Sequence, residues 1–452
     1  MFFKYKIILS TNISLKHINK LAIPALIAGV SEPILSLTDA AIIGNVNLNA
    51  TEALAAVGIV STFLSMLIWV FGQTRSALSS IVSQYLGANK LEEIKNLPSQ
   101  AIFIITALSI VIIFITYPFA GYIFKFYNAE NLILDYAIEY YKIRVFGFPF
   151  TLFTIAVFGA FRGLQNTFYP MIIAIIGAST NIILDYVLVY GVSNLIPAMH
   201  IKGAAFASVA SQFFMAILSA YYLLKKTNIP LLVSFPFNKE ITRFLAMIGN
   251  LIIRTIALNV TLYLATSFAT NYGKEYIAAY TIAINLWFLG AFLIDGYASA
   301  GNILSGKLLG GKEYSKLISL SNKLIKYGII VGIIMACIGS LFYLSIGKIF
   351  TKQPEVLKQF YSVFWLVLAM QPLCALAFIF DGMFKGLGKM KDLRNLLLIA
   401  TFLVFIPALY ILDKNNFKIL GVFIAFTLWI VARGIPLIIK FRKEFLPLSQ
   451  KG

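Results

Sequence analysis

The stretch Gly159-Ala160-Phe161-Arg162-Gly163-Leu164 returns 223 residues later as Gly382-Met383-Phe384-Lys385-Gly386-Leu387. Other residues recur at the same distance without a gap, among them Leu86-Gly87 as Leu309-Gly310 and Pro149 as Pro372. Some matches arise by chance in so apolar a chain, but glycine and proline are scarcer, and their joint recurrence indicates a duplication. The second half of the chain therefore repeats the first, and we expect the two halves to fold alike.

Composition places the chain in a membrane. Hydrophobic residues make up 60% of its 452 residues and charged residues 12%, which leaves too little polar surface to cover a soluble core. Apolar segments of about 20 residues, the length that crosses a bilayer, recur along the chain. They are too long for barrel strands and lack strand alternation, so we expect an all-α integral membrane protein. The twelve predicted transmembrane segments are residues 18–43, 53–78, 97–124, 136–161, 168–192, 202–224, 241–268, 276–304, 318–350, 359–384, 393–412 and 418–440.

The positive charge of the chain indicates its orientation rather than a nucleic-acid partner. Of 37 Lys and Arg residues, 24 lie in the termini and even-numbered connectors, and ten lie in the odd-numbered connectors. Because cytoplasmic loops carry the excess of Lys and Arg, both termini are predicted to be cytoplasmic. Topology and contact with anionic lipid headgroups then explain the formal net charge of +19.

A polar, proline-containing connector at residues 225–240 divides the chain near its midpoint. Six predicted segments precede it and six follow it, and an even number leaves both halves with the same orientation in the membrane. Parallel repeats of this kind are typical of secondary transporters, whose substrate sites lie between the repeats. We therefore predict a six-helix lobe at 1–224, a cytoplasmic linker at 225–240 and a six-helix lobe at 241–452, around a central cavity.

Five carboxylates fall within the predicted segments: Glu32, Asp39, Asp185, Asp295 and Asp381. An acid inside a membrane is costly unless it is paired, protonated or in contact with water, so each is a candidate functional residue. The alternative for each is a helix-end position at the level of the lipid headgroups.

Polar stripes on two of the segments suggest a site for a coupling ion. Glu32 and Asp39 share one helical face, and Asn181 and Asp185 share another, with the two aspartates toward the predicted extracellular ends. Two carboxylates that converge in a desolvated site favour uptake of a proton near neutral pH. The same pair could instead bind sodium, with Asn181 supplying a carbonyl oxygen.

The duplication supports a functional role for the two aspartates. At the 223-residue offset Asp39 corresponds to Leu262, and Asp185 corresponds to Ala408. Packing needs alone would tend to be shared by both lobes, so an acidic site that only the first lobe carries indicates function.

The second half carries a different polar set. Arg254 lies near the middle of its segment, and either Asp295 or Asp381 could neutralise it. The group is either a structural ion-pair network or part of substrate binding or gating. Ser208 is a further candidate for substrate contact or gating.

Aromatic residues offer a second kind of binding surface. Trp69, Phe71, Trp287 and Phe292 could line a cavity whose aromatic faces bind flat organic cations. The alternative for each is contact with lipid or packing in the core.

Several stretches resemble one transporter family in their order and spacing: Ser31–Gly44, Ser83–Ala88, Phe161–Thr167, Asn181–Asp185, Lys202–Ser208, Arg254-Thr255, Asp295–Ala298 and Gln371–Gly382. The family is that of the multidrug and toxic compound extrusion (MATE) transporters, and the second half resembles its DinF-like branch. The resemblance implies that Asp39, Asn181 and Asp185 form the cation-coupling cluster and that the protein is a monomer. Asn302 departs from the DinF-like pattern, which usually has a glutamate there, so no acid site is carried over to that position.

We therefore predict a secondary active antiporter in the inner membrane of a bacterium. It would export amphipathic, often cationic organic compounds in exchange for protons or sodium ions. The chain has no phosphate-binding G-x-x-x-x-G-K-[ST] stretch, so the ion gradient is the expected energy source. Small organic substrates and membrane lipids are the expected partners, and no cofactor beyond the coupling ion is expected.

Two other functions stay open. A lipid-linked oligosaccharide flippase of the same broad superfamily would need more than twelve helices or a markedly basic cavity, for which Arg75, Arg254 and Arg433 are the candidates. An integral-membrane enzyme is not expected, because the two histidines, His17 and His200, lie outside the apolar segments and form no cluster with carboxylates.

Overall fold

The computed structural model describes residues 13–44, 50–192 and 195–450, and the side chains of residues 31–37, 40 and 50 lie outside the described set. The first lobe comprises α1 Leu15–Ile43, α2 Ala50–Phe71, α3 Thr74–Gly87, η1 Leu91–Ile94, α4 Leu97–Thr116, α5 Ala120–Phe126, α6 Asn131–Arg144, η2 Val145–Gly147, α7 Phe148–Gly163, α8 Phe168–Tyr190 and α9 His200–Lys226. The second lobe comprises α10 Glu240–Asn271, α11 Lys274–Gly310, α12 Tyr314–Leu341, α13 Tyr343–Phe350, α14 Pro354–Ala369, α15 Gln371–Gly386, α16 Met390–Ile399, η3 Ala400–Phe405, α17 Ile406–Lys414 and α18 Lys418–Ser449.

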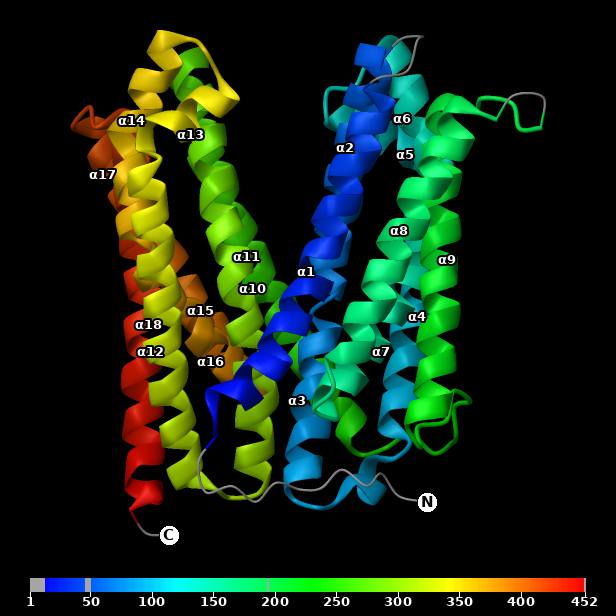
Figure 1. The fold of residues 1–452 in the computed structure, drawn as a ribbon, viewed down its shortest axis with the longest axis vertical. Coiled ribbons are helices and arrows are strands. Elements are labelled where there is room, and N and C mark those ends of the chain that lie inside the picture. Colours follow the sequence, from blue (N-terminus) through cyan, green and yellow to red (C-terminus); the bar gives the residue numbers. More distant parts are fainter. Residues whose placement is uncertain (1–12, 45–49, 193–194, 451–452) are drawn as a thin grey trace.

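The two lobes stand side by side and diverge toward one end of the molecule (Figure 1). The start of α1 and the end of α18 lie at the opposite end, where the lobes meet, which we call the closed end. The short helices α5 and α13 lie at the end where the lobes spread apart, which we call the open end.

The lengths of the helices confirm an all-α membrane protein. Ten helical stretches of the described chain are long and apolar enough to cross a bilayer, and some of them join two or three of the labelled helices, as α2 joins α3. The bent pair α14 and α15 gives an eleventh when it is taken as one span. The 29 residues of α1, part of whose side chains lie outside the described set, are also long enough to cross. Together these spans correspond to the twelve predicted segments.

Interruptions of the helices recur at the repeat distance. The predicted segments 97–124 and 318–350 end earlier than expected, because α4 stops at Thr116 and α12 at Leu341, each followed by a separate short helix. Because α5 and α13 are themselves apolar, hydropathy could not predict either break. Each fourth span is also broken just before a proline, Pro149 in α7 and Pro372 in α15, where the proline removes a helical hydrogen-bond donor. The break between α14 and α15 bends that span by 50°.

Equivalent residues of the two repeats meet at the closed end, where α3 crosses α11. A Cβ atom on Gly87 would collide with the carbonyl oxygen of Lys307, and one on Gly310 would collide with that of Gln84, the repeat equivalent of Lys307. Small residues let the two backbones approach closely. The pairing is reciprocal, as expected of two similar lobes that meet about a local twofold axis.

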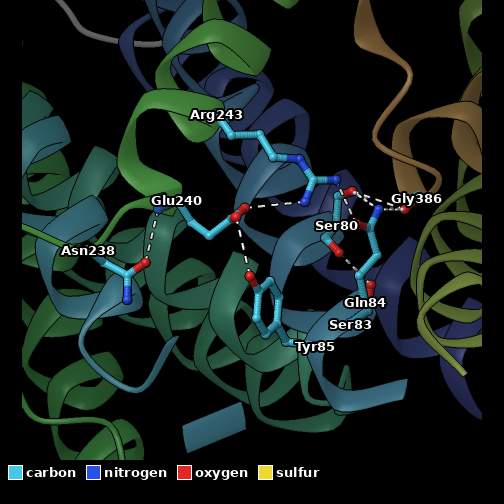
Figure 2. A network of polar contacts seen from close by, with 8 residues as sticks. All are labelled: Ser80, Ser83, Gln84, Tyr85, Asn238, Glu240, Arg243 and Gly386. Atoms are coloured by element: carbon cyan, nitrogen blue, oxygen red, sulfur yellow. Dashed lines mark hydrogen bonds and ion pairs between the residues drawn. The ribbon is translucent and has the colours of Figure 1, made fainter. Parts of the chain in front are cut away.

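Side chains add a polar cluster to this contact, which we call the seal: Ser80, Gln84, Tyr85, Glu240, Arg243 and Gly386 (Figure 2). Gln84 of α3 donates from Nε2 to the carbonyl oxygen of Gly386 in the second lobe at 2.8 Å and accepts from Arg243 at 2.6 Å. Tyr85 donates to Glu240 at 3.2 Å, and Glu240 is ion-paired with Arg243 at 3.2 Å. The seal therefore ties α3 to α10 and to the end of α15.

A buried ion cluster holds the second lobe together. Asp381 of α15 accepts from Arg254 of α10 at 2.5 Å and from Lys385 at 2.9 Å, and lies 3.4 Å from Arg433 of α18. Of the two acids proposed for Arg254, the structure therefore selects Asp381. One carboxylate links three helices, and charge-assisted hydrogen bonds of this kind are strong when they are desolvated.

We expect Gly310→Ala to separate the lobes at the closed end, because the added Cβ meets the backbone of Gln84. The matched control is Gly249→Ala, where an added Cβ has no atom within 4 Å. Spin labels at Lys90→Cys and Lys391→Cys, in a background of Cys337→Ser, would report the separation by double electron–electron resonance. A Gly310→Ala distance distribution that superimposes on the parent would contradict the role of this contact.

We expect Asp381→Asn to destabilise the protein more than Arg254→Met does. Asp381→Asn leaves two buried arginines and the partly buried Lys385 without this acid, which costs about 3 to 5 kcal/mol by analogy with other broken buried pairs. Arg254→Met leaves Asp381 with Lys385 and Arg433. Thermal unfolding in detergent would test the order, with Asp295→Asn as the control, since Asp295 forms none of the ion pairs of the described residues. Equal losses for all three variants would contradict the shared role of Asp381.

Candidate functional site

Three helices of the first lobe bring together a buried polar cluster. Asp39 comes from α1, Asn181 and Asp185 come from α8, and Ser208 comes from α9. Their side chains are between 0 and 3% exposed. The helical spacing of Asn181 and Asp185 aims both at α1, which lies against α8. The sequence placed the two acids on single faces, and the packing of α1 on α8 makes those faces meet.

Hydrogen bonds join the two acids through neutral groups. The amide nitrogen of Asn181, in the orientation that satisfies its neighbours, donates to Asp39 Oδ1 and to Asp185 Oδ2 at 3.2 Å each. Ser208 donates to Asp39 Oδ2 at 3.0 Å, and the Tyr140 hydroxyl lies 3.5 Å from the same oxygen. Ser208, expected near substrate, is thus placed against Asp39, and Tyr140 is a contact that the sequence reading missed.

The cluster has an acceptor that is not satisfied by the described residues. Asp185 Oδ1 has no hydrogen-bond partner among the described residues. Within that set neither aspartate belongs to an ion pair, although the charge of Arg144 acts on Asp185 through space. Two buried carboxylates without a paired cation can share a proton, or offer oxygen ligands to a sodium ion together with the amide of Asn181. The side chain of Glu32, the fourth predicted coupling residue, lies outside the described set.

A cavity of about 390 Å³ lies between the lobes. Its wall includes residues of α1, α2, α3, α7, α10, α11, α15 and α18. Of the four aromatic residues expected in such a cavity, Trp69, Trp287 and Phe292 line it, whereas Phe71 packs against Phe148. A volume of this size is in the range of small-molecule sites.

The charged residues of the cavity include two that the sequence reading overlooked. The predicted residues Arg254, Asp295 and Asp381 line the cavity, and Arg162 and Lys385 join them. These two cations occupy equivalent positions in the repeated Gly-x-Phe motif, so the duplication itself was the signal that could have found them. Arg162 reaches across to the second lobe, where it donates to Ser299 Oγ at 3.1 Å.

Asn302 and its equivalent in the first repeat, Ser79, both line the cavity, so the local twofold axis that relates the repeats passes close to it. Ser79 donates to Asn302 Oδ1 at 2.9 Å, and the two residues are 223 positions apart in the chain. Equivalent positions of α3 and α11 therefore touch each other at the floor between the lobes.

Comparison with known proteins agrees with this architecture. A sequence profile of the MatE family matches residues 24–187 and 251–411. Protein DETOXIFICATION 43 of Arabidopsis thaliana is 27% identical over 304 residues, which cover 67% of this chain and 56% of that protein. The chain thus spans just over half the length of that relative. DNA damage-inducible protein F of Escherichia coli (strain K12) is 22% identical over 94% of this chain and 91% of its own length.

Solved structures show the same fold. A crystal structure of MATE in the bent conformation superimposes with a TM-score of 0.89 over 96% of both chains, at 21% sequence identity. The profile covers most of the chain, in two segments that fall in its two lobes. The chain therefore belongs to the MatE family, that of the multidrug and toxic compound extrusion transporters, with the DinF-like proteins among its relatives.

Proposed function

We propose that the protein is a secondary active efflux antiporter that exports amphipathic organic compounds in exchange for protons or sodium ions. The observation that carries the proposal is the buried cluster of Asp39, Asn181 and Asp185, in one lobe only, in a protein with a cavity between its two lobes. An acid is kept inside a membrane at a cost, and ion coupling is a function that needs one there. The multidrug resistance proteins among the relatives, such as MdtK of Edwardsiella ictaluri, support export as the direction of transport.

The proposal includes the membrane in which the protein lies, the orientation of its termini and its oligomeric state. Bacterial relatives and the distribution of Lys and Arg support the plasma membrane of a bacterium, with cytoplasmic termini. A monomeric chain is proposed with them, as the resemblance to the family implies. On this orientation the closed end faces the cytoplasm and the cavity opens outward. An ion that enters from outside then reaches a protein that is ready to release its substrate, and the ion gradient supplies the energy.

Helix α1 provides the physical connection between ion and substrate. It carries Asp39, contributes residues 26 and 28–30 to the cavity wall, and contacts both α8 and α11. Gly296 of α11 lies so close to α1 that a Cβ there would stand 2.7 Å from the carbonyl oxygen of Ala22. Protonation of the cluster, or binding of sodium to it, would weaken or replace the contacts of Asp39 and allow α1 to move against the cavity and the second lobe.

The lipid-linked oligosaccharide flippase is not favoured. The spans of the described chain together with α1 correspond to twelve segments rather than more, and the matching family is that of the extrusion transporters. Basic residues also line the cavity of this chain, as they would in such a flippase. They are evidence about the class of substrate and do not by themselves identify a flippase.

Replacement of Asp39 by asparagine should reduce coupled export to the background rate. Asparagine keeps the size and the acceptor for Ser208 but cannot take up a proton or carry a charge. Exchange of substrate for ions would be measured in proteoliposomes with proton and sodium gradients imposed separately, with Asp135→Asn, an exposed aspartate of α6, as the matched control. Exchange at the parental rate in Asp39→Asn would remove Asp39 from the coupling mechanism.

Replacement of Asp185 by asparagine should move the pH dependence of substrate release as well as its amplitude. Removal of one negative charge from a coupled pair eases ionisation of the other acid, so the release curve should shift to lower pH. Arg144 and Tyr140 face the same cluster and stay unchanged in this variant. Substrate dissociation would be followed from pH 5 to 9 in the parent protein, Asp39→Asn and Asp185→Asn. Three superimposable curves would contradict the coupled pair.

A further inference from the structure

Basic side chains outnumber acids in the wall of the central cavity. Five cationic residues line it against two acidic ones: Arg75, Arg162, Arg254, Lys385 and Arg433 against Asp295 and Asp381. They come from both lobes, since Arg75 and Arg162 lie on α3 and α7 and the other three lie on helices of the second lobe. The low-dielectric walls of a cavity between apolar helices focus the field of such an excess into the cavity.

The two acids leave this excess largely uncompensated. Asp381 is shared by three cations. Asp295 forms no ion pair among the described residues and acts on Arg75 and Arg162 only through space. Among the described residues, Arg162 donates hydrogen bonds to neutral oxygens, those of Ser299 at 3.1 Å and of the Ala25 backbone at 3.5 Å.

Hydrogen-bond donors of the cavity lack acceptors. Among the described cavity-lining side chains, the buried nitrogens without a partner are Arg75 Nε, Arg162 Nε, Arg254 Nε, Arg433 Nη1 and Asn302 Nδ2. Four of these side chains, all except Arg75, are only 4 to 6% exposed. A buried donor without an acceptor is costly, and most such groups in proteins have a partner. The remaining buried atom of this kind in the described lining is the Thr154 hydroxyl, so the buried lining atoms without a partner are five nitrogen donors and one hydroxyl.

The aromatic faces that would attract an organic cation are partly occupied already. The guanidinium of Arg433 lies 4.8 Å from the ring centre of Trp429 and 5.4 Å from that of Phe378. Both rings line the cavity. A cationic substrate would have to compete with Arg433 for these faces and would meet the field of four further basic side chains.

We propose that this cavity binds amphipathic organic anions: compounds with a carboxylate, sulfonate or phosphate group on an apolar body. The inference rests on the proposed export function and names the substrate class of that site. The acidic group accepts from the cationic side chains of the wall, with Arg162 of the first lobe and Arg254 and Arg433 of the second as its principal donors. The apolar body lies against Trp69, Trp287 and Phe292. An anion held by both lobes also compensates the repulsion between their cations.

Two probes with the same aromatic body would test the role of the acid group. The probe 1-anilinonaphthalene-8-sulfonate carries a sulfonate, and N-phenyl-1-naphthylamine lacks it. Equilibrium binding would be measured by fluorescence in phosphatidylcholine nanodiscs, with empty nanodiscs subtracted, and tetraphenylphosphonium would serve as the cationic competitor. We expect the sulfonate to bind at least about tenfold more tightly than the neutral probe, as hydrogen bonds to a charged group imply. Equal affinity, or displacement of the sulfonate by tetraphenylphosphonium at comparable concentration, would overturn the proposal.

Variants locate the binding in the cavity. Arg162→Gln should weaken sulfonate binding by about tenfold or more without changing binding of the neutral probe, and removal of Arg162 leaves no acid without its partner. Arg75→Gln, at a less buried position, provides a second test if Arg162→Gln is poorly folded. The control is Arg442→Gln, which removes the same charge from an exposed position of α18. Selective loss in the cavity variants supports the proposal, and equal loss in Arg442→Gln overturns it.

Two further experiments are needed. One distinguishes a lipid headgroup from a soluble anion as the ligand, and the other tests the anion site separately from transport. Competition by phosphatidylglycerol in the nanodisc would identify the acidic group as a lipid headgroup, and absence of competition would identify a soluble organic anion; both outcomes keep the anionic class. Selective sulfonate binding without ion-coupled exchange in proteoliposomes would contradict the antiporter and leave the anion site standing. Ion-coupled exchange of tetraphenylphosphonium, without selective sulfonate binding, would support the antiporter and refute the anion site.

Discussion

Charge inside the bilayer is the constraint on which the rest of this structure depends. A charged side chain in hydrocarbon needs an opposite charge, hydrogen-bond partners or water. The protein meets this need in two different ways. Asp381 collects three cations and thereby joins α10, α15 and α18 into one unit. Asp39 and Asp185 have hydroxyl and amide partners instead, an arrangement that can accept a proton or a cation without displacing a resident one.

The acidic and the basic residues of the protein occupy different places. The acidic cluster lies within the first lobe, whereas the basic residues line the cavity between the lobes. Because α1 contributes to both places and touches α11, the coupling that we propose would pass from Asp39 to the cavity through a single helix. Anionic substrates would suit this division, since the coupling ion and the substrate would then occupy sites of opposite sign and would not compete directly.

The duplication explains both the symmetry of the closed end and the asymmetry of the sites. Gly87 with Lys307 and Gly310 with Gln84 form equivalent backbone contacts, and Ser79 bonds to its own repeat partner Asn302. Two similar lobes that meet about an axis place equivalent residues against each other, so small residues at one contact are required at both. Away from that axis the lobes have diverged, and Leu262 and Ala408 stand where the first lobe has its acids.

Properties that depend on neighbours along the chain could be predicted from the sequence. The twelve spans, the duplication, the stripes that carry Asp39 and Asp185, and the resemblance to the family all follow from hydropathy, spacing and short motifs. The sequence could not show that Asp381 rather than Asp295 pairs with Arg254, or that Ser208 meets Asp39. These contacts depend on how far each helix is rotated and displaced against helices that are distant in the chain. Hydropathy is nearly uniform around a membrane helix, so it leaves that rotation undetermined, and only the packing of the whole molecule decides it.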